Sequence, residues 1–224
     1  MLPAASRKKG NPIRNPHNAR YDKSDYFCIV QNRARAPTEQ LKQTIMAKRV
    51  LIISSSPRRH GNSDRLCDEF MRGAQESGND VEKISLGDYR INYCTGCSVC
   101  SMYGKPCPQK DDAAALVQKM IDADVIVMAT PVYFYTMSAQ MKTLIDRTCA
   151  RYLEIKNKEF YFIVAAAETD KSMMERTIDG FRGFLDCLEN PKECGVVYGV
   201  GAWKVGEIDD KPAMKEAYEM GRKL

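Results

Sequence analysis

Histidine is scarce in this sequence, since His17 and His60 are the only two among 224 residues. A Ser-His-Asp arrangement needs a histidine as its general base, so we do not expect hydrolase chemistry of that kind. Long apolar runs are also missing, because the longest, residues 160–167, is far shorter than the roughly 20 residues of a membrane-spanning helix. The sequence therefore predicts a chain with no membrane segment and no membrane partner.

Most of the chain carries no net positive charge. The formal net charge is +5, but residues 1–45 alone carry +6 and residues 46–224 carry −1. Nucleic-acid binding calls for a basic surface on the folded part, so we expect no nucleic-acid partner.

The basic N-terminal segment differs in composition from the rest. Residues 1–45 contain prolines, asparagines and arginines and show no sustained helical or strand period, which is typical of a disordered leader. A processed targeting peptide is one alternative. Another is that Met46, directly before the first apolar run, is the true start of translation. We therefore predict one folded domain, 46–224.

Nine cysteines occur without a hydrophobic signal peptide before them, so a reducing cytoplasm is the expected location. In that compartment clustered cysteines are metal ligands or redox-active thiols more often than structural disulfides. Cys67, Cys149, Cys187 and Cys194 fall in helix or strand patterns, and a buried, inert thiol is expected at each.

Short apolar runs alternate with amphipathic stretches from Met46 onward, which is typical of βαβ units. Strands are predicted near 49–54, 81–85, 124–130, 159–166 and 195–200. Helices are predicted near 63–77, 111–122, 138–149, 172–189 and 211–222, with Asn62, Asp111 and Ser138 as caps. The prediction is an α/β fold with a doubly wound, five-stranded parallel sheet in three α/β/α layers. Ligands bind such sheets at the carboxyl ends of the strands.

A polar loop between the first strand and the first helix has the features of a phosphate site. Backbone N–H groups at the helix start, serine hydroxyls and an arginine can all bind a phosphate, and Gly61 lets the backbone approach it. The candidate residues are Ser54, Ser56, Arg58, Gly61, Asn62 and Ser63. The loop matches neither G-x-G-x-x-G nor a Walker motif. A polar β-to-α turn without a ligand is the alternative.

The stretch Ser54–Ser63 reads S-S-S-P-R-R-H-G-N-S and resembles the flavin-phosphate loop of the NADPH-dependent FMN reductase branch of the flavodoxin superfamily. A second resemblance follows in Thr130-Pro-Val-Tyr and the later K-x-x-x-D-R of 142–147. The resemblance implies FMN as cofactor, with the turn along its ring: Pro131, Val132, Tyr133, Phe134 and Tyr135. A surface aromatic cluster is the alternative for the three aromatic residues.

Four cysteines follow the second strand with the spacing C-x2-C-x2-C-x6-C: Cys94, Cys97, Cys100 and Cys107. Thiolates this close in sequence can surround one inorganic centre. The motif resembles that of iron-sulfur flavoproteins, which implies a 4Fe-4S cluster. Unligated thiols, a zinc site and a redox disulfide remain as alternatives. Thr95, Gly96, Gly104 and Pro106 are expected to keep this loop from forming a helix.

The resemblance implies an FMN-dependent oxidoreductase that moves electrons from NAD(P)H or ferredoxin to a small acceptor. A cluster-free quinone, azo or flavin reductase, a non-enzymatic electron carrier and a flavin-binding regulator are the alternatives. No catalytic side-chain acid or base is expected, because the flavin carries the chemistry. His60, 165–168 and Trp203 are further candidates near the flavin, each of them also explained by ordinary packing. A homodimer or homotetramer is expected from the family.

Overall fold

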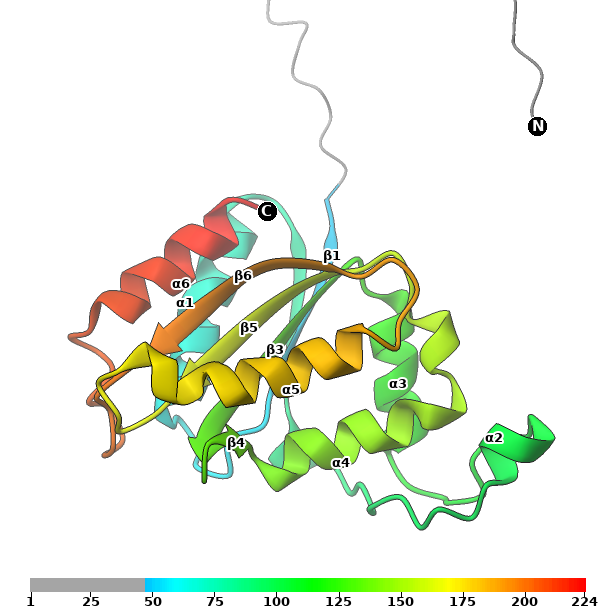
Figure 1. Cartoon of the computed structure of the whole chain (residues 1–224). Helices are drawn as coiled ribbons and strands as arrows, with labels where there is room; N and C mark the ends of the chain where they lie inside the picture. The colour runs from blue at the N-terminus through cyan, green and yellow to red at the C-terminus, as the bar shows by residue number, and fades with distance from the viewer. Residues whose placement is uncertain (1–46) are drawn as a thin grey trace, which may run out of the picture. The chain divides into compact units, whose positions relative to one another are not determined.

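Five of the apolar runs form the parallel strands of a central sheet. The computed structural model describes residues 47–224, so the predicted leader, with His17 and Cys28, lies outside the described residues. The parallel strands are β1 (Arg49–Ser54), β2 (Asp80–Ser85), β3 (Val125–Tyr133), β5 (Glu159–Ala165) and β6 (Lys192–Gly199). Their spatial order is β2-β1-β3-β5-β6, which is the flavodoxin-like order with β1 and β3 at the switch point (Figure 1).

Helices cover both faces of this sheet (Figure 1). One face packs against α1 (Asn62–Glu76) and α6 (Pro212–Arg222). The other packs against α3 (Ala113–Asp122), α4 (Ala139–Arg147) and α5 (Glu175–Leu185). The predicted three-layer α/β/α architecture is therefore confirmed.

Alternate residues of the inner strands β1, β3 and β5 enter opposite cores, which explains why these three strands read as continuous apolar runs. In β1, Leu51 and Ile53 pack on the α3–α5 side, whereas Val50 and Ile52 pack on the α1–α6 side. All four side chains are buried. The strands end at one edge of the sheet, and every candidate ligand loop begins there.

Two short elements depart from the prediction. The cysteine-rich segment was expected to lack a helix, but α2 (Val99–Tyr103) forms within it. Ser98 and Gly104 flank α2 with positive φ angles of 59° and 60°, so the helix is limited to little more than one turn. A small antiparallel strand, β4 (Thr136–Met137), pairs with the end of β3 and makes the sheet six-stranded in total.

Element boundaries differ from the prediction by a few residues. The predicted helix 172–189 is a 3-10 turn, Lys171–Met174, followed by the shorter α5. Gly61, not Asn62, is the N-cap of α1, and Asp112, not Asp111, is the N-cap of α3. The predicted cap of α4, Ser138, is confirmed. The remaining 3-10 turns are Leu86–Asp88, Thr148–Ala150 and Tyr152–Glu154. In the part of the chain that the structure covers, no helix combines the length and apolarity needed to cross a membrane.

Helices α1 and α6 approach each other through glycines. A Cβ atom on Gly73 would lie 2.2 Å from the carbonyl oxygen of Tyr218, and one on Gly221 would lie 2.2 Å from that of Phe70. Both obstacles are helix backbone, which cannot move aside as a side chain could. The close packing on this face of the sheet therefore depends on the two glycines.

Replacing Gly73 with alanine is expected to lower the free energy of unfolding by about 1–3 kcal/mol, the usual cost of overpacking. Gly183→Ala in α5 is the matched control, because a Cβ there meets nothing within 4 Å. The control should gain up to about 1 kcal/mol from its higher helix propensity. Urea unfolding midpoints measure both changes. Equal stability of the two variants would contradict the packing argument.

Candidate functional site

The loop after β1 presents unpaired hydrogen-bond donors at the start of α1. Gly61 is the N-cap, and no side chain caps the first turn. The first N–H groups of a helix have no partner within the helix, and the helix dipole adds a partial positive charge there. This end of α1 is therefore suited to an anion.

Two serine hydroxyls at this position have no hydrogen-bond partner among residues 47–224. Ser54 Oγ, at the end of β1, and Ser63 Oγ, in the first turn of α1, are both buried. A buried hydroxyl without a partner costs about 1–3 kcal/mol, so such groups ordinarily serve a ligand or a water molecule. Both serines are among the predicted phosphate residues.

The backbone of the loop is tightly turned. Ser56 Oγ donates to the carbonyl oxygen of Arg58 at 3.0 Å and accepts from Arg58 N at 3.2 Å. A Cβ on Gly61 would lie 2.5 Å from Ser56 Oγ and 3.1 Å from the carbonyl oxygen of Arg58. Only glycine fits this position without displacing the turn.

Ser55, which the motif leaves unspecified, fixes the loop to the rest of the site. Its hydroxyl donates to Ala129 O in β3 at 2.9 Å, and the Ser138 hydroxyl donates to Ser55 Oγ at 2.9 Å. Ser138 N in turn donates to Thr130 Oγ1 at 2.9 Å. All three side chains are buried. This network holds the loop of residues 54–63, which we call the phosphate loop after its predicted role, and the turn after β3 in one fixed arrangement.

The segment after β6 also contacts the phosphate loop. Arg58 Nη1 donates to Trp203 O at 2.9 Å, and Asn62 Nδ2 donates to Lys204 O at 3.0 Å. Gly206 N donates back to Asn62 Oδ1 at 3.1 Å. The sequence singled out Trp203 in this segment but did not predict these hydrogen bonds. Two predicted phosphate residues, Arg58 and Asn62, therefore also orient this segment.

A cavity of about 120 Å³ is lined by both segments that were predicted to bind flavin. The walls come from the phosphate loop, Pro131–Tyr133, the small residues 165–167 and Trp203. Phe134 and Tyr135 lie outside it, at the tip of the β3–β4 turn, where both have positive φ. Phe134 is fully exposed, and the Tyr135 ring lies 5.7 Å from the Arg176 guanidinium.

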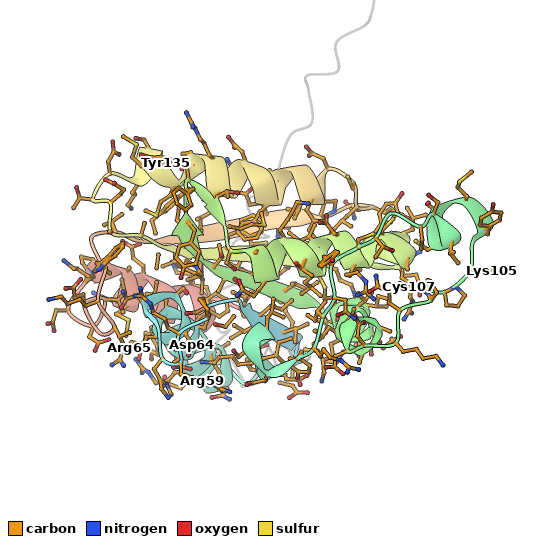
Figure 2. All side chains as sticks on the ribbon, turned by 90° about the horizontal axis from the view of Figure 1, so that it is seen from below. Arg59, Asp64, Arg65, Lys105, Cys107 and Tyr135 are labelled. Carbon is orange, nitrogen blue, oxygen red and sulfur yellow. The ribbon has the colours of Figure 1, made fainter. Side chains whose placement is uncertain are left out.

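The four predicted ligand cysteines lie on a loop of residues 93–110, which we call the cysteine loop. Figure 2 shows Cys107 and Lys105 on this loop, on a different part of the surface from Tyr135. Backbone and side-chain hydrogen bonds close the base of the loop. Arg90 N donates to Asp112 Oδ2 at 2.7 Å, and Gln109 Nε2 donates to Tyr93 O at 3.1 Å.

A buried ion pair completes the base of the cysteine loop. Arg147, at the end of α4, donates to both carboxylate oxygens of Asp111 at 2.6 and 3.0 Å. The exposed fractions of the two side chains are only 3% and 0%. Asp111 also accepts from the backbone N–H of Asn92 and Ala113, while Arg147 donates to Asn92 O. The hydrogen bond from Arg147, with help from these amides, lowers the pKa of Asp111 to about 2.

The cysteine side chains of the loop are accessible and free. Cys94 and Cys97 are exposed, Cys100 and Cys107 are half-buried, and none forms a disulfide. Four thiols on one loop are a suitable donor set for a 4Fe-4S cluster. A single zinc ion requires sulfurs about 3.8 Å apart, from tetrahedral bonds of about 2.3 Å. No three of these four sulfurs lie within 4.8 Å of one another, so the side chains as placed do not form a closed zinc site.

Cysteines outside the loop do not all match the expectation of buried thiols. Cys67 is buried in α1, but Cys149 and Cys187 are exposed and Cys194 is half-buried. Cys149 follows α4 and lies beside the cysteine loop, where burial and the neighbouring Cys100 thiol raise its pKa. The expectation was wrong because α4 ends at Arg147, so Cys149 belongs to a 3-10 turn and not to a helix face.

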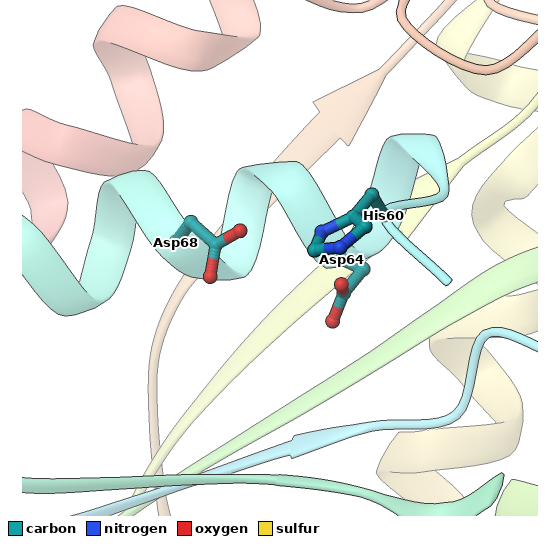
Figure 3. A group of neighbouring side chains, drawn as sticks. All are labelled: His60, Asp64 and Asp68. Atoms are coloured by element: carbon teal, nitrogen blue, oxygen red, sulfur yellow. The ribbon is translucent and has the colours of Figure 1, made fainter. Parts of the chain in front are cut away.

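His60, Asp64 and Asp68 form a compact group on α1 and the loop that precedes it (Figure 3). Their ligand atoms lie within 4.8 Å of one another, a spacing that a metal ion could occupy. However, the Lys83 ammonium already contacts Asp64 at 3.0 Å and Asp68 at 2.5 Å. Partial burial works to lower the pKa of Lys83, but the two aspartates outweigh it and raise that pKa. The group is therefore an ion-pair cluster in which Lys83 offsets part of the negative charge of the two aspartates.

Comparison with known proteins identifies the family. The sequence model of the NADPH-dependent FMN reductase family matches residues 48–188, well over half of the chain. The chain belongs to this family. The predicted family and flavodoxin-like fold are confirmed, and the protein is an FMN-dependent NAD(P)H oxidoreductase of the flavin reductase type.

Two archaeal relatives carry the name iron-sulfur flavoprotein. The one from Archaeoglobus fulgidus is 33% identical over 178 residues, covering 77% of this chain and 76% of the relative. The one from Methanocaldococcus jannaschii is 44% identical over 100 residues, covering 45% of this chain and 51% of the relative.

Solved structures with low sequence identity share the fold. The NAD(P)H:quinone oxidoreductase from Methanothermobacter marburgensis has a TM-score of 0.62 at 16% identity, covering 80% of this chain and 97% of that chain. An azoreductase from Bacillus anthracis has a TM-score of 0.59 at 16% identity, covering 79% and 100%. These likenesses show that the fold is shared at low sequence identity.

Because the pKa of Asp111 is lowered in the folded protein, the free energy of unfolding of this flavin reductase should depend on pH in the acidic range. Its carboxylate stays charged when folded but is protonated below about pH 4 when unfolded. As pH falls from about 4 to about 2, the free energy of unfolding of the wild type should therefore fall by about 2 kcal/mol more than that of Asp111→Asn. Urea unfolding across this range measures the difference. Asp112→Asn, at the exposed neighbour, should behave like the wild type, and parallel curves for all three proteins would refute the assignment.

Proposed function

We propose that this flavin reductase binds FMN with its phosphate at the start of α1 and its ring in the cavity beside Pro131–Tyr133. The observation that carries the proposal is the pair of buried, unpartnered hydroxyls of Ser54 and Ser63 beside open helix N–H groups. A phosphate supplies several acceptor oxygens to such donors. Arg58, Ser56 and Asn62 border the same space and add charge and polar atoms.

The residues around the ring would orient the cofactor and limit water. The backbone of Pro131–Tyr135 offers polar groups to the ring edge, and Tyr133 offers a flat aromatic face. Small residues at 165–167 leave room for close approach. When bound, FMN supplies hydride and single-electron chemistry, so the protein needs no catalytic acid or base of its own. NAD(P)H is the proposed reductant and a small molecule the acceptor.

We further propose that Cys94, Cys97, Cys100 and Cys107 hold a 4Fe-4S cluster. Free, accessible thiols on one short loop support this, as do the two relatives named iron-sulfur flavoproteins. The cluster would supply one-electron transfer, which allows a ferredoxin as an alternative donor to NAD(P)H. A homo-oligomer and a reducing, cytoplasmic setting belong to the same proposal.

A cluster-free reductase is the second candidate. Its support is that solved structures with this fold include a quinone oxidoreductase and an azoreductase. Reduction of a quinone or azo dye by NADPH, with flavin but no iron in the protein, would favour this candidate. Flavin without any oxidation of NADH or NADPH would instead indicate an electron carrier.

The FMN site is tested by Gly61→Ala. The added methyl group would meet Ser56 Oγ and displace the loop turn. We expect at least a tenfold loss of FMN affinity, measured by flavin fluorescence on titrating the apoprotein. Gly87→Ala is the control, because the nearest atom to its Cβ is 3.7 Å away. Wild-type affinity in Gly61→Ala would refute the placement of the phosphate.

The cluster site is tested by anaerobic purification followed by iron, sulfide and flavin analysis. The wild type should contain about four irons per chain, as a 4Fe-4S centre requires. Cys97→Ser should lose most of the iron and keep its flavin. Cys187→Ser, at an exposed thiol on the C-terminal side of α5, should keep both. Iron-free wild type with full flavin would reject the cluster and leave the FMN proposal intact.

A further inference from the structure

The Arg147 guanidinium reaches one cysteine of the loop directly. Its Nη2 lies 3.5 Å from Cys107 Sγ and donates to it, while the same nitrogen donates to Asp111. Arg147 is at the end of α4, so a residue of the rigid core contacts a residue of the cysteine loop. Within residues 47–224, no charged side chain forms a hydrogen bond to Cys94, Cys97 or Cys100.

Arg147 still has one unused donor. Its Nε is buried and has no hydrogen-bond partner within residues 47–224. Arg147 also lines a cavity of about 320 Å³ together with Cys107 and loop residues 104–106. Both carboxylate oxygens of Asp111 are engaged by the Nη atoms, so Nε takes no part in that ion pair.

The Arg147 guanidinium is protonated at every physiological pH, as arginine side chains in proteins are. Its positive charge lies beside Cys107 and is paired with the Asp111 carboxylate. A thiolate at Cys107 gains a charge-assisted hydrogen bond, which is roughly twice as strong as a neutral one.

We propose that Arg147 is a positioning residue for the 4Fe-4S site, which orients Cys107 as a ligand and raises the reduction potential of the centre. The inference rests on the proposed cluster. Reduction adds one electron and one negative charge to the centre, breaks no bond and moves no proton. The electron comes from a one-electron donor such as reduced ferredoxin, or dithionite in the test. Arg147 favours the reduced state because that state carries more negative charge.

Arg151 provides a matched control. It lies four residues further along the chain, carries the same charge and lines the same cavity. Its hydrogen bonds, however, go to Glu154 and to Gln118 Oε1 at 2.8 Å, not to a cysteine. Arg151→Gln therefore tests what the loss of one positive charge near this cavity does when Cys107 is not touched.

Arg147→Gln alone would leave Asp111 buried without its partner, which could prevent folding. The double variant Asp111→Asn/Arg147→Gln removes both charges and keeps side chains of similar shape and hydrogen-bonding capacity. Arg147→Lys keeps the charge and loses the second branch of the fork. Iron content, flavin content and melting temperature are measured for each protein as purified without oxygen.

The deciding readout is the reduction potential from an EPR-monitored titration with dithionite. The double variant should show at least a tenfold fall in the equilibrium constant for reduction, about 59 mV for a one-electron couple. Arg147→Lys should shift in the same direction by less, and Arg151→Gln should match the wild type. Loss of iron from the Arg147 variants alone, with flavin content and melting temperature unchanged, would equally support the positioning role.

Three results would overturn the proposal. Wild-type potential and iron content in the double variant would remove the role of Arg147. An equal shift of the reduction potential in Arg151→Gln would mean that Arg147 acts only through a general effect of charge. Iron-free wild type would remove the cluster itself, and so would distinguish failure of the underlying function from failure of Arg147.

Discussion

The buried pair of Arg147 and Asp111 determines how the cysteine loop is attached to the rest of the protein. Two charges removed from water are expensive, and breaking such a pair by removing one partner typically costs about 3–5 kcal/mol. Here Asp111 also accepts from the backbone N–H groups of Asn92 and Ala113, at the two ends of the loop, and Arg147 donates to Asn92 O. The pair therefore fixes the base of a segment that has little regular structure and few buried apolar side chains of its own.

The parallel sheet provides the second constraint. Strands β1, β3, β5 and β6 all end at the same edge, so the phosphate loop, the Pro131 turn, the small residues 165–167 and the Trp203 segment meet there. The hydrogen bonds of Ser55 and Asn62 join these segments, which come from distant parts of the sequence. A ligand at this edge touches loops that are held in place before it arrives, which is the usual arrangement for doubly wound sheets.

Sequence alone predicted the sheet, its helices and the order of its motifs, because apolar runs and caps are local signals. It could not predict contacts made across the fold. The bonds of Arg58 and Asn62 to the segment after β6, and the pairing of Arg147 with Asp111, join residues far apart in sequence. Helix α2 was missed because positive φ at Ser98 allows a helix to begin where residue preferences argue for a loop. Cys149 was misjudged because the end of α4 determines its exposure.

The two buried serine hydroxyls of the phosphate loop have a consequence for the lifetime of the protein in a cell. Their unmet hydrogen bonds count against the folded state, and a bound phosphate group offsets that cost. Any ligand that binds only the folded state also stabilises it by mass action. Degradation acts on unfolded molecules, so chains that lack flavin would be removed faster than chains that carry it. The abundance of this reductase would then follow the supply of its cofactor, with no dedicated sensor.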